Sequence, residues 1–202
     1  MKILMTAFDA FGGETINPAL EAVQRVIPPM GVELVRIEVP TIFGKSVQVV
    51  ADAIAREHPD VVLCIGQAGG RAQITPERVA INVMDATIAD NIGVMPVDEP
   101  VVPGGENALF ATVPIKQMVK AIQLEGIPAK LSNTAGTFVC NQLLYGVLYL
   151  CKARYPHTRA GFIHVPFLPQ QVAGKGNLPS MPLEDMVRAL EAVLACLAVP
   201  QT

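Results

Sequence analysis

Short apolar runs alternate with longer amphipathic stretches along the whole chain. The apolar runs are predicted as strands and lie at residues 2–7, 32–39, 61–66, 129–133 and 160–165, with a further strand predicted from the apolar and polar alternation at 78–85. Helices are predicted at residues 18–26, 44–57, 115–125, 137–153 and 182–197. Strands and helices that take turns in this way predict an α/β protein built on a mostly parallel sheet.

Polar and small residues follow several of the predicted strands. Segments 8–17 and 67–77 each follow the end of a strand, Cys140 lies near the start of the helix after strand 129–133, and His164 lies near the end of strand 160–165. Open parallel sheets bind ligands at the carboxyl ends of their strands. These four segments are therefore predicted to share one rim of the sheet. Two long connections, 90–105 and 174–182, have the length of lids or binding loops.

The length of 202 residues predicts one domain, 1–202, with a substantial core. The chain is 51% hydrophobic and 16% charged, but it contains no apolar stretch near the ~20 residues of a membrane helix and no signal-peptide pattern. Its net charge is -3 and it has no basic run, so neither nucleic acid nor a membrane is expected as a partner. The apolar excess is expected at subunit interfaces, in a cytoplasmic protein.

The four cysteines are Cys64, Cys140, Cys151 and Cys196. They form no CxxC pair, so neither a metal site nor a redox-active disulfide is expected. Cys140 lies in the first turn of its predicted helix, where free N–H groups and the helix dipole are expected to lower the thiol pKa. This position makes it a candidate nucleophile, and the alternative is a buried side chain on an apolar helix. The other three lie in apolar surroundings and are predicted to be packed hydrophobes.

Only one of the three histidines, His164, lies inside an apolar strand, in GFIHVPFLP. It is either a general base for Cys140 or a buried histidine bonded to a backbone carbonyl. Glu77, in ITPERVAIN, either orients that imidazole as the third member of a triad or forms a surface ion pair with Arg78. The segment GQAGGR at 66–71 lacks a phosphate-loop pattern, and its glycines are expected to allow tight turns and close approach of a ligand.

Four motifs follow one another in order between residues 8 and 171: FDAFGGETINPA at 8–19, GQAGGRAQITPERVAIN at 66–82, SNTAGTFVCNQLLYG, and GFIHVPFLPQQ. With these motifs the chain resembles the pyrrolidone carboxyl peptidases, also called pyroglutamyl peptidases of type I. The resemblance implies a three-layer α/β/α fold of the phosphorylase/hydrolase type with a twisted, mostly parallel sheet. It also implies a catalytic triad of Glu77, Cys140 and His164, with no metal or other cofactor.

The resemblance also implies a pocket for the pyrrolidone ring. The apolar wall is expected from Phe8, Phe11, Ile88, Phe138 and Val139, and the hydrogen bonds to the lactam from Asn17 and Gln67. A neutral, compact ring without a free α-amine needs apolar walls and a donor–acceptor pair, and no acidic residue.

Two positions depart from the family pattern. Gln142 stands where compared members have histidine. Thr87 stands where the family usually carries an arginine near the active site, so that contribution is expected to be missing.

The activity implied is that of a cysteine omega-peptidase that removes an N-terminal pyroglutamyl residue from peptides through a thioester, and the assembly implied is a homotetramer. Two alternatives remain open from the residues alone. One is a nucleoside-phosphorylase-like enzyme that uses the glycine-rich segment for phosphate, and the other is a catalytically silent protein that binds a small ligand on the same fold. Cleavage of a chromogenic pyroglutamyl amide, unaffected by added phosphate, separates the three.

Overall fold

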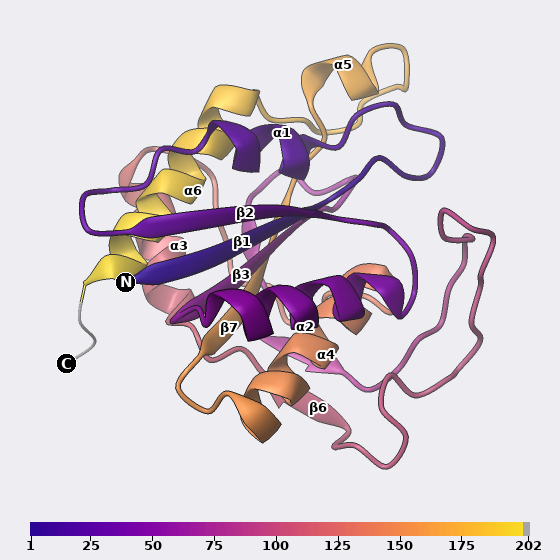
Figure 1. Cartoon of the computed structure of the whole chain (residues 1–202). Helices are drawn as coiled ribbons and strands as arrows, with labels where there is room; N and C mark the ends of the chain where they lie inside the picture. The colour runs from indigo at the N-terminus through magenta and orange to yellow at the C-terminus, as the bar shows by residue number, and fades with distance from the viewer. Residues whose placement is uncertain (200–202) are drawn as a thin grey trace.

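The computed structural model describes residues 1–199, and a five-stranded sheet lies at its centre (Figure 1). The strands are β1 (Lys2–Phe8), β2 (Glu33–Val39), β3 (Val61–Gln67), β4 (Thr75–Pro76) and β7 (Arg159–Val165). Their spatial order is β2-β1-β3-β7-β4. The first four are parallel, and β4 runs antiparallel beside β7. A separate two-stranded sheet pairs β5 (Val79–Ile81) with β6 (Ala108–Phe110).

Helices cover both faces of the central sheet, with α1, α3 and α6 on one face and α2 and α4 on the other (Figure 1). Their bounds are α1 (Pro18–Arg25), α2 (Lys45–Glu57), α3 (Ile115–Leu124), α4 (Val139–Arg154), α5 (Pro169–Val172) and α6 (Leu183–Ala198). Because successive strand residues point to opposite faces, β1 contributes Met5 to one buried apolar cluster and Leu4 to the other. Burial on both faces explains why the strands are almost continuously apolar. The three-layer α/β/α prediction is confirmed.

The predicted strand at 129–133 is not a regular strand. It makes isolated parallel bridges, Ile74 to Ala129 and Glu77 to Ser132. Ser132 N donates to Pro76 O at 3.0 Å, but Pro76 has no N–H to donate in return. The missing bond interrupts the parallel ladder in its middle, so this segment runs beside the sheet without joining it as a continuous strand.

The predicted strand at 78–85 is shorter than expected, because only the residues of β5 form a ladder. Beyond Ile81, the side chain of Asn141 replaces a neighbouring strand: it accepts from Ile81 N at 3.0 Å and donates to Ile81 O and Val83 O at 2.9 Å. Because a side chain and not a neighbouring strand holds this backbone, the segment does not continue as a regular strand. The sequence also gave no indication of β4, β6 or α5, each of which has four residues or fewer.

Residues 85–105 form a long extended arm that projects from the body (Figure 1). Its two sides pair loosely, through a bond from Ala86 N to Pro96 O at 2.9 Å, and a bridge between Met84, directly before the arm, and Glu99. The arm carries exposed apolar side chains, which are Ile88, Ile92, Val94, Met95 and Val97. The expectation of a long connection at 90–105 therefore agrees with the structure. Across residues 1–199, no helix has the length and apolar character to span a membrane.

Candidate active site

Cys140 and His164 lie on the same face of the sheet, at the rim predicted from the strand ends. His164 on β7 pairs in register with Gly66 on β3. Gly66 has no side chain, and Cys140 Sγ occupies the space beside it: a Cβ built at Gly66 would lie 3.1 Å from that sulfur. Paired residues on neighbouring strands direct their side chains to the same face, and neighbouring strands are about 4.8 Å apart. The thiol of α4 and the imidazole of β7 are therefore one strand apart.

Glu77 reaches His164 because of the register of β4. Thr75 pairs with His164 across the antiparallel β4–β7 ladder, and Glu77, two residues on, points to the same face as Thr75. His164 Nδ1 lies 2.7 Å from Glu77 Oε1, and both side chains are almost fully buried. A carboxylate only accepts hydrogen bonds, so Nδ1 carries the proton and donates it to Glu77. Nε2 is then left as an acceptor on the imidazole.

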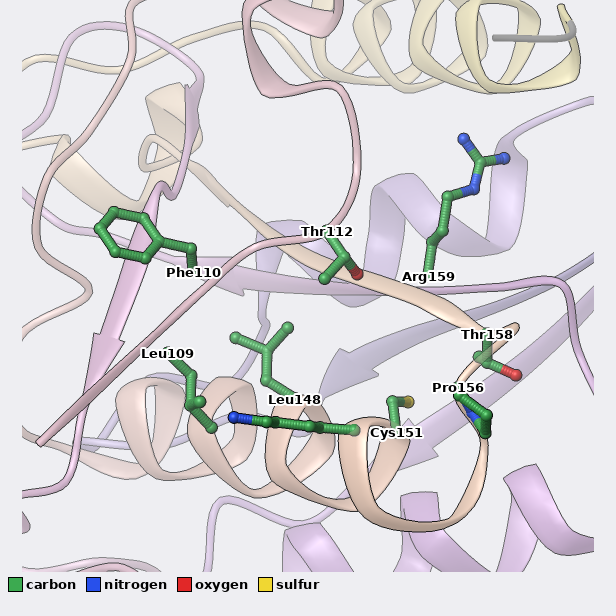
Figure 2. Close-up of a pocket in the computed structure, with 9 residues that line it drawn as sticks. Leu109, Phe110, Thr112, Leu148, Cys151, Pro156, Thr158 and Arg159 are labelled. Atoms are coloured by element: carbon green, nitrogen blue, oxygen red, sulfur yellow. The ribbon is translucent and has the colours of Figure 1, made fainter. Parts of the chain in front are cut away.

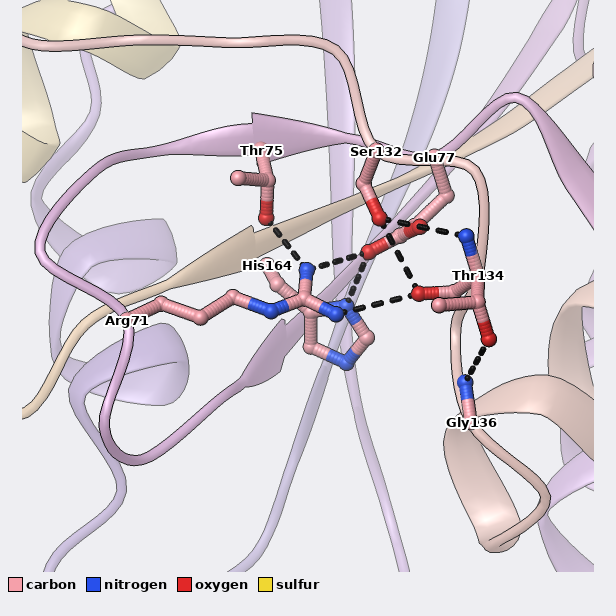
Figure 3. A network of polar contacts seen from close by, with 7 residues as sticks. All are labelled: Arg71, Thr75, Glu77, Ser132, Thr134, Gly136 and His164. Carbon is pink, nitrogen blue, oxygen red and sulfur yellow. Dashed lines mark hydrogen bonds and ion pairs between the residues drawn. The ribbon is translucent and has the colours of Figure 1, made fainter.

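The cation beside Glu77 is Arg71, not the neighbouring Arg78 that the sequence suggested (Figure 3). Arg71 Nη1 donates to Glu77 Oε1 and to Thr75 Oγ1, both at 2.6 Å, and Nη2 donates to Thr134 O at 3.0 Å. Sequence reasoning missed this role. The available signal was a basic residue inside GQAGGR, directly after the strand that ends at the rim.

The protonation states of the site differ from the prediction for Cys140. Burial, together with the charge of Glu77, raises the pKa of the Cys140 thiol to about 12, although the charge of Arg71 opposes the rise. Cys140 keeps partial exposure, so solvent moderates the rise, but the thiol stays protonated at neutral pH. The expected lowering by the helix start is therefore wrong, because the cost of burying the thiolate outweighs the dipole.

His164 is a neutral imidazole, and Glu77 beside it is an ionised carboxylate. Burial lowers the pKa of His164, and the hydrogen bond and charge of Glu77 oppose this only in part. For Glu77, burial alone would raise the carboxyl pKa, but the hydrogen bond and charge of His164, together with the hydrogen bond from Arg71, outweigh burial and lower it. The resting site thus holds a neutral thiol, a neutral imidazole and an ionised carboxylate.

Two amides that follow Cys140 fix the start of α4. Asn141 binds the backbone after β5, as described above. Gln142 Oε1 accepts from Gly44 N at 2.8 Å, directly before α2. Gln142, one of the two departures from the family pattern, therefore links the starts of the two helices on this face. Thr87, the other departure, is exposed on the arm.

Three half-buried phenylalanines form an aromatic cluster near the rim. The ring of Phe138 lies 6.2 Å from that of Phe11 and 5.3 Å from that of Phe43, measured between centroids. Phe43 was missed from the sequence, although it follows the carboxyl end of β2, where the same strand-end rule applies. Of the other predicted wall residues, Phe8 is 2% exposed and Val139 0% exposed, so both lie in the core beneath the cluster. Ile88 is exposed on the arm.

The two predicted lactam-binding amides are buried and already partly bonded. Asn17 Oδ1 accepts from Ala19 N at 3.0 Å and so caps α1, while its Nδ2 donates to Asp9 O at 2.9 Å. Gln67 Oε1 accepts from Gln171 Nε2 at 2.9 Å. One lone pair on Asn17 Oδ1 and the N–H groups of Gln67 remain to meet a ligand.

A clasp on the arm, Asp90 and Asn91, holds the loops that carry the aromatic cluster. Asp90 Oδ2 accepts from Phe43 N at 3.0 Å. Asn91 Nδ2 donates to Ala10 O at 2.9 Å and to Asp9 Oδ1 at 3.1 Å, next to Phe11. The arm, the loop after β1 and the loop after β2 are therefore joined by side-chain hydrogen bonds.

An apolar cavity of about 300 Å³ lies away from this rim (Figure 2). Its lining includes Leu148 and Cys151 from the second half of α4, and Thr158 and Arg159 at the start of β7. Because His164 lies near the carboxyl end of β7, the cavity lies towards the amino end of this strand, opposite the rim that carries His164. In the part of the chain from residue 1 to 199, no three His, Cys, Asp or Glu side chains group as a metal site.

Comparison with known proteins identifies the family. A family model described as pyroglutamyl peptidase matches residues 1–199. The chain belongs to the pyroglutamyl peptidase family. Membership confirms the resemblance drawn from the motifs, and it gives no support to the phosphorylase-like or silent alternatives.

Individual members of the pyroglutamyl peptidase family match over nearly their full length. Pyrrolidone-carboxylate peptidase from Clostridium botulinum is 54% identical over 192 residues, which are 95% of this chain and 90% of the relative. The same enzyme from Streptococcus suis is 52% identical over 198 residues, or 98% and 92% of the two chains. A solved pyroglutamyl peptidase I from Bacillus amyloliquefaciens superposes with a TM-score of 0.95 at 47% identity, covering 98% of this chain and 95% of that one.

Proposed function

We propose that this protein hydrolyses the amide bond after an N-terminal pyroglutamyl residue, with Cys140 as nucleophile, His164 as general acid–base and Glu77 as the group that orients His164. The observation that carries the proposal is the buried hydrogen bond between Glu77 and His164, 2.7 Å long, one strand from Cys140 Sγ. Membership of the pyroglutamyl peptidase family supports the choice of substrate.

The protonation states favour general-base activation over a preformed ion pair. His164 Nε2 accepts the proton of the Cys140 thiol as the sulfur attacks the pyroglutamyl carbonyl carbon. Glu77 stabilises the imidazolium that forms for as long as the proton stays there. His164 then passes this proton to the departing amine nitrogen, the C–N bond breaks, and a thioester to Cys140 remains.

Hydrolysis of the thioester repeats the sequence with water. His164 Nε2 takes a proton from water as its oxygen attacks the thioester carbon, and returns the proton to the sulfur as free pyroglutamate leaves. In both steps the carbonyl oxygen becomes negative. The first turn of α4 supplies backbone N–H groups without intrahelical partners for this oxyanion.

The substrate pocket is proposed between the aromatic cluster and the buried amides. Phe11, Phe43 and Phe138 supply apolar surface for a neutral ring, while Asn17 and Gln67 supply an acceptor and donors for its lactam. A substrate with a free α-ammonium would bury an unpaired charge against these rings, which costs several kcal/mol.

The test is the release of a chromophore from pyroglutamyl, glutaminyl and glutamyl amides. The pyroglutamyl amide is expected to be cleaved well and the other two poorly. Cys140→Ser and His164→Gln should fold normally and lose about a thousandfold or more of kcat. Cys196→Ser is the matched control, because Cys196 is a partly exposed cysteine on α6, and it should keep full activity. Similar kcat/KM for glutaminyl and pyroglutamyl amides, or an active Cys140→Ser, contradicts the proposal.

We also propose that the protein assembles as a homotetramer in the cytoplasm. The exposed apolar side chains of the arm support assembly, since such surface is normally covered by a partner. The four free cysteines suit a reducing compartment. Light scattering at micromolar concentration should give the mass of four chains, and a monomer at that concentration contradicts the assembly.

A further inference from the structure

Arg71 and His164 share a single oxygen of Glu77 (Figure 3). Arg71 Nη1 lies 2.6 Å and His164 Nδ1 lies 2.7 Å from the same Oε1. The other oxygen, Oε2, is buried and has no hydrogen-bond partner within residues 1–199. Arg71 and His164 therefore bond to the same oxygen of the carboxylate, which has lone pairs for both, and the guanidinium charge lies next to the acceptor of the imidazole.

The positive charge of Arg71 offsets part of the stabilisation that Glu77 gives to a charged His164. A guanidinium stays protonated throughout the working pH range of proteins. Its charge holds Glu77 ionised, so that Nδ1 of the imidazole keeps its proton, and the same charge opposes a second positive charge on His164. Both effects favour a neutral imidazole with Nε2 free. The charged and titratable groups around the imidazole are Glu77, Arg71 and Cys140, with Cys64 near the thiol.

Arg71 also ties together the segments that carry the site. It follows β3, it bonds to Thr75 on β4, and it bonds to Thr134 O in the loop that leads to Cys140. That loop is braced internally, since Ser132 Oγ donates to Thr134 O at 3.0 Å and Gly136 N donates to Thr134 Oγ1 at 3.1 Å (Figure 3). The side chain of Arg71 is 27% exposed, so its fork-shaped guanidinium group lies between the buried carboxylate and solvent.

We propose that Arg71 is a positioning residue of the peptidase, which by sharing Glu77 Oε1 keeps His164 a neutral base and by binding Thr134 O holds the loop before Cys140. The proposal rests on the proposed function, in which His164 acts as the base. It assigns two separable roles to one side chain: the positive charge acts on His164, and the fork geometry acts on the loop.

Three variants separate the two roles. Arg71→Met removes the charge and the fork, Arg71→Lys keeps a charge without the fork, and Arg188→Met removes an exposed arginine on α6 as the matched control. Two measurements are made on each: the pH dependence of kcat/KM on a pyroglutamyl amide, and an imidazole titration by ¹⁵N NMR. The chain has three histidines, so each signal can be assigned by substitution.

Arg71→Met is expected to raise the pKa of His164 and to move the acid limb of kcat/KM to higher pH. Loss of the charge-assisted bonds should lower kcat/KM about tenfold or more at pH 8, and the loss should grow towards pH 6, where more of the imidazole is charged. Arg71→Lys should lower kcat/KM by a similar factor at every pH, with the acid limb near its wild-type position. Arg188→Met should match the wild type in both measurements.

Several outcomes overturn the proposal. An unchanged or lower His164 pKa in Arg71→Met shows that the charge does not act on the base. Identical profiles for the Lys and Met variants show that only the geometry matters. If Arg71→Met does not fold, Arg71→Gln serves as the test variant. In the wild type alone, a His164 imidazole that is still charged above pH 6.5 contradicts the proposal. The titration needs no turnover, so an inactive wild type would refute the proposed function while the role of Arg71 is still decided.

Discussion

Replacing Gly66 by alanine tests whether the space left by this glycine is what brings Cys140 to His164. The added Cβ would lie 2.7 Å from Cζ and 2.9 Å from Cε1 of Phe162, and 3.1 Å from Cys140 Sγ. The ring would have to shift, and the sulfur would have to yield by a few tenths of an ångström. The φ of Gly66 is not positive, so alanine brings no backbone strain and the whole effect is steric.

The magnitude follows from the two contacts. An extra methyl group in a packed interior costs about 1–3 kcal/mol of unfolding free energy. A displaced nucleophile costs rate as well, since a misplacement near 1 Å can lower it about a hundredfold, so we expect kcat/KM to fall about tenfold to a hundredfold. A displacement of the sulfur acts on the chemical step, so the fall is expected mainly in kcat.

Gly161→Ala separates this effect from general crowding. Gly161 lies on β7, and an added Cβ there would lie 2.3 Å from Val113 Cγ2, on the face away from Cys140. Urea unfolding should show comparable losses of stability for the two variants, while kcat/KM for a pyroglutamyl amide should fall only in Gly66→Ala. If Gly66→Ala keeps the wild-type kcat/KM, or Gly161→Ala loses as much, the argument from the space at Gly66 is wrong.

Three further predictions concern protonation and the family departure. The Cys140 pKa, raised to about 12, predicts that alkylation by iodoacetamide accelerates about tenfold per pH unit from 7 to 9, and a plateau near neutral pH in peptide mapping contradicts it. Thr87 is exposed, so Thr87→Arg should fold. Because the resemblance implies an arginine at this position near the active site, the variant should raise kcat/KM on a pyroglutamyl amide, and an equal or lower rate rejects the expectation. Burial lowers the pKa of His164, so as pH falls below about 6.5 the unfolded chain binds that proton first and stability is lost. The unfolding free energy should therefore drop between pH 6.5 and 5, and less in His164→Gln; equal drops in urea titrations would show that His164 does not cause it.

The sequence predicted which segments meet, and it did not predict the charges and interruptions that depend on packing. The strand-end rule placed the segments of Glu77, Cys140 and His164 on one rim, because parallel strands share a direction. Alternation along the strand could also have excluded Arg78 as the partner of Glu77, since consecutive residues point to opposite faces.

Other features depend on contacts between distant parts of the chain. The pKa of Cys140 depends on how tightly the sheet and α4 enclose the thiol, which a position in a helical turn does not reveal. The break in the segment 129–133 comes from Pro76, which is distant in sequence and adjacent only after folding. Phe43 and the clasp of Asp90 and Asn91 likewise depend on loops that meet across the rim.

The clasp has a consequence for how the proposed substrate pocket opens. The amide protons of Thr41, Phe43 and Asn91 are held by the Asp9 carboxylate, the Asp90 carboxylate and the Thr41 carbonyl, respectively, and none of these bonds belongs to a helix or a sheet ladder. Such bonds can break together without disturbing the core, as a local opening that costs less than global unfolding. The three amides should therefore exchange with deuterium as one unit, faster than those of β1 and β3. Opening of this small cooperative unit would then limit entry and release of the pyrrolidone ring of the substrate. A ligand whose pyrrolidone ring occupies the proposed pocket would slow exchange at all three amides.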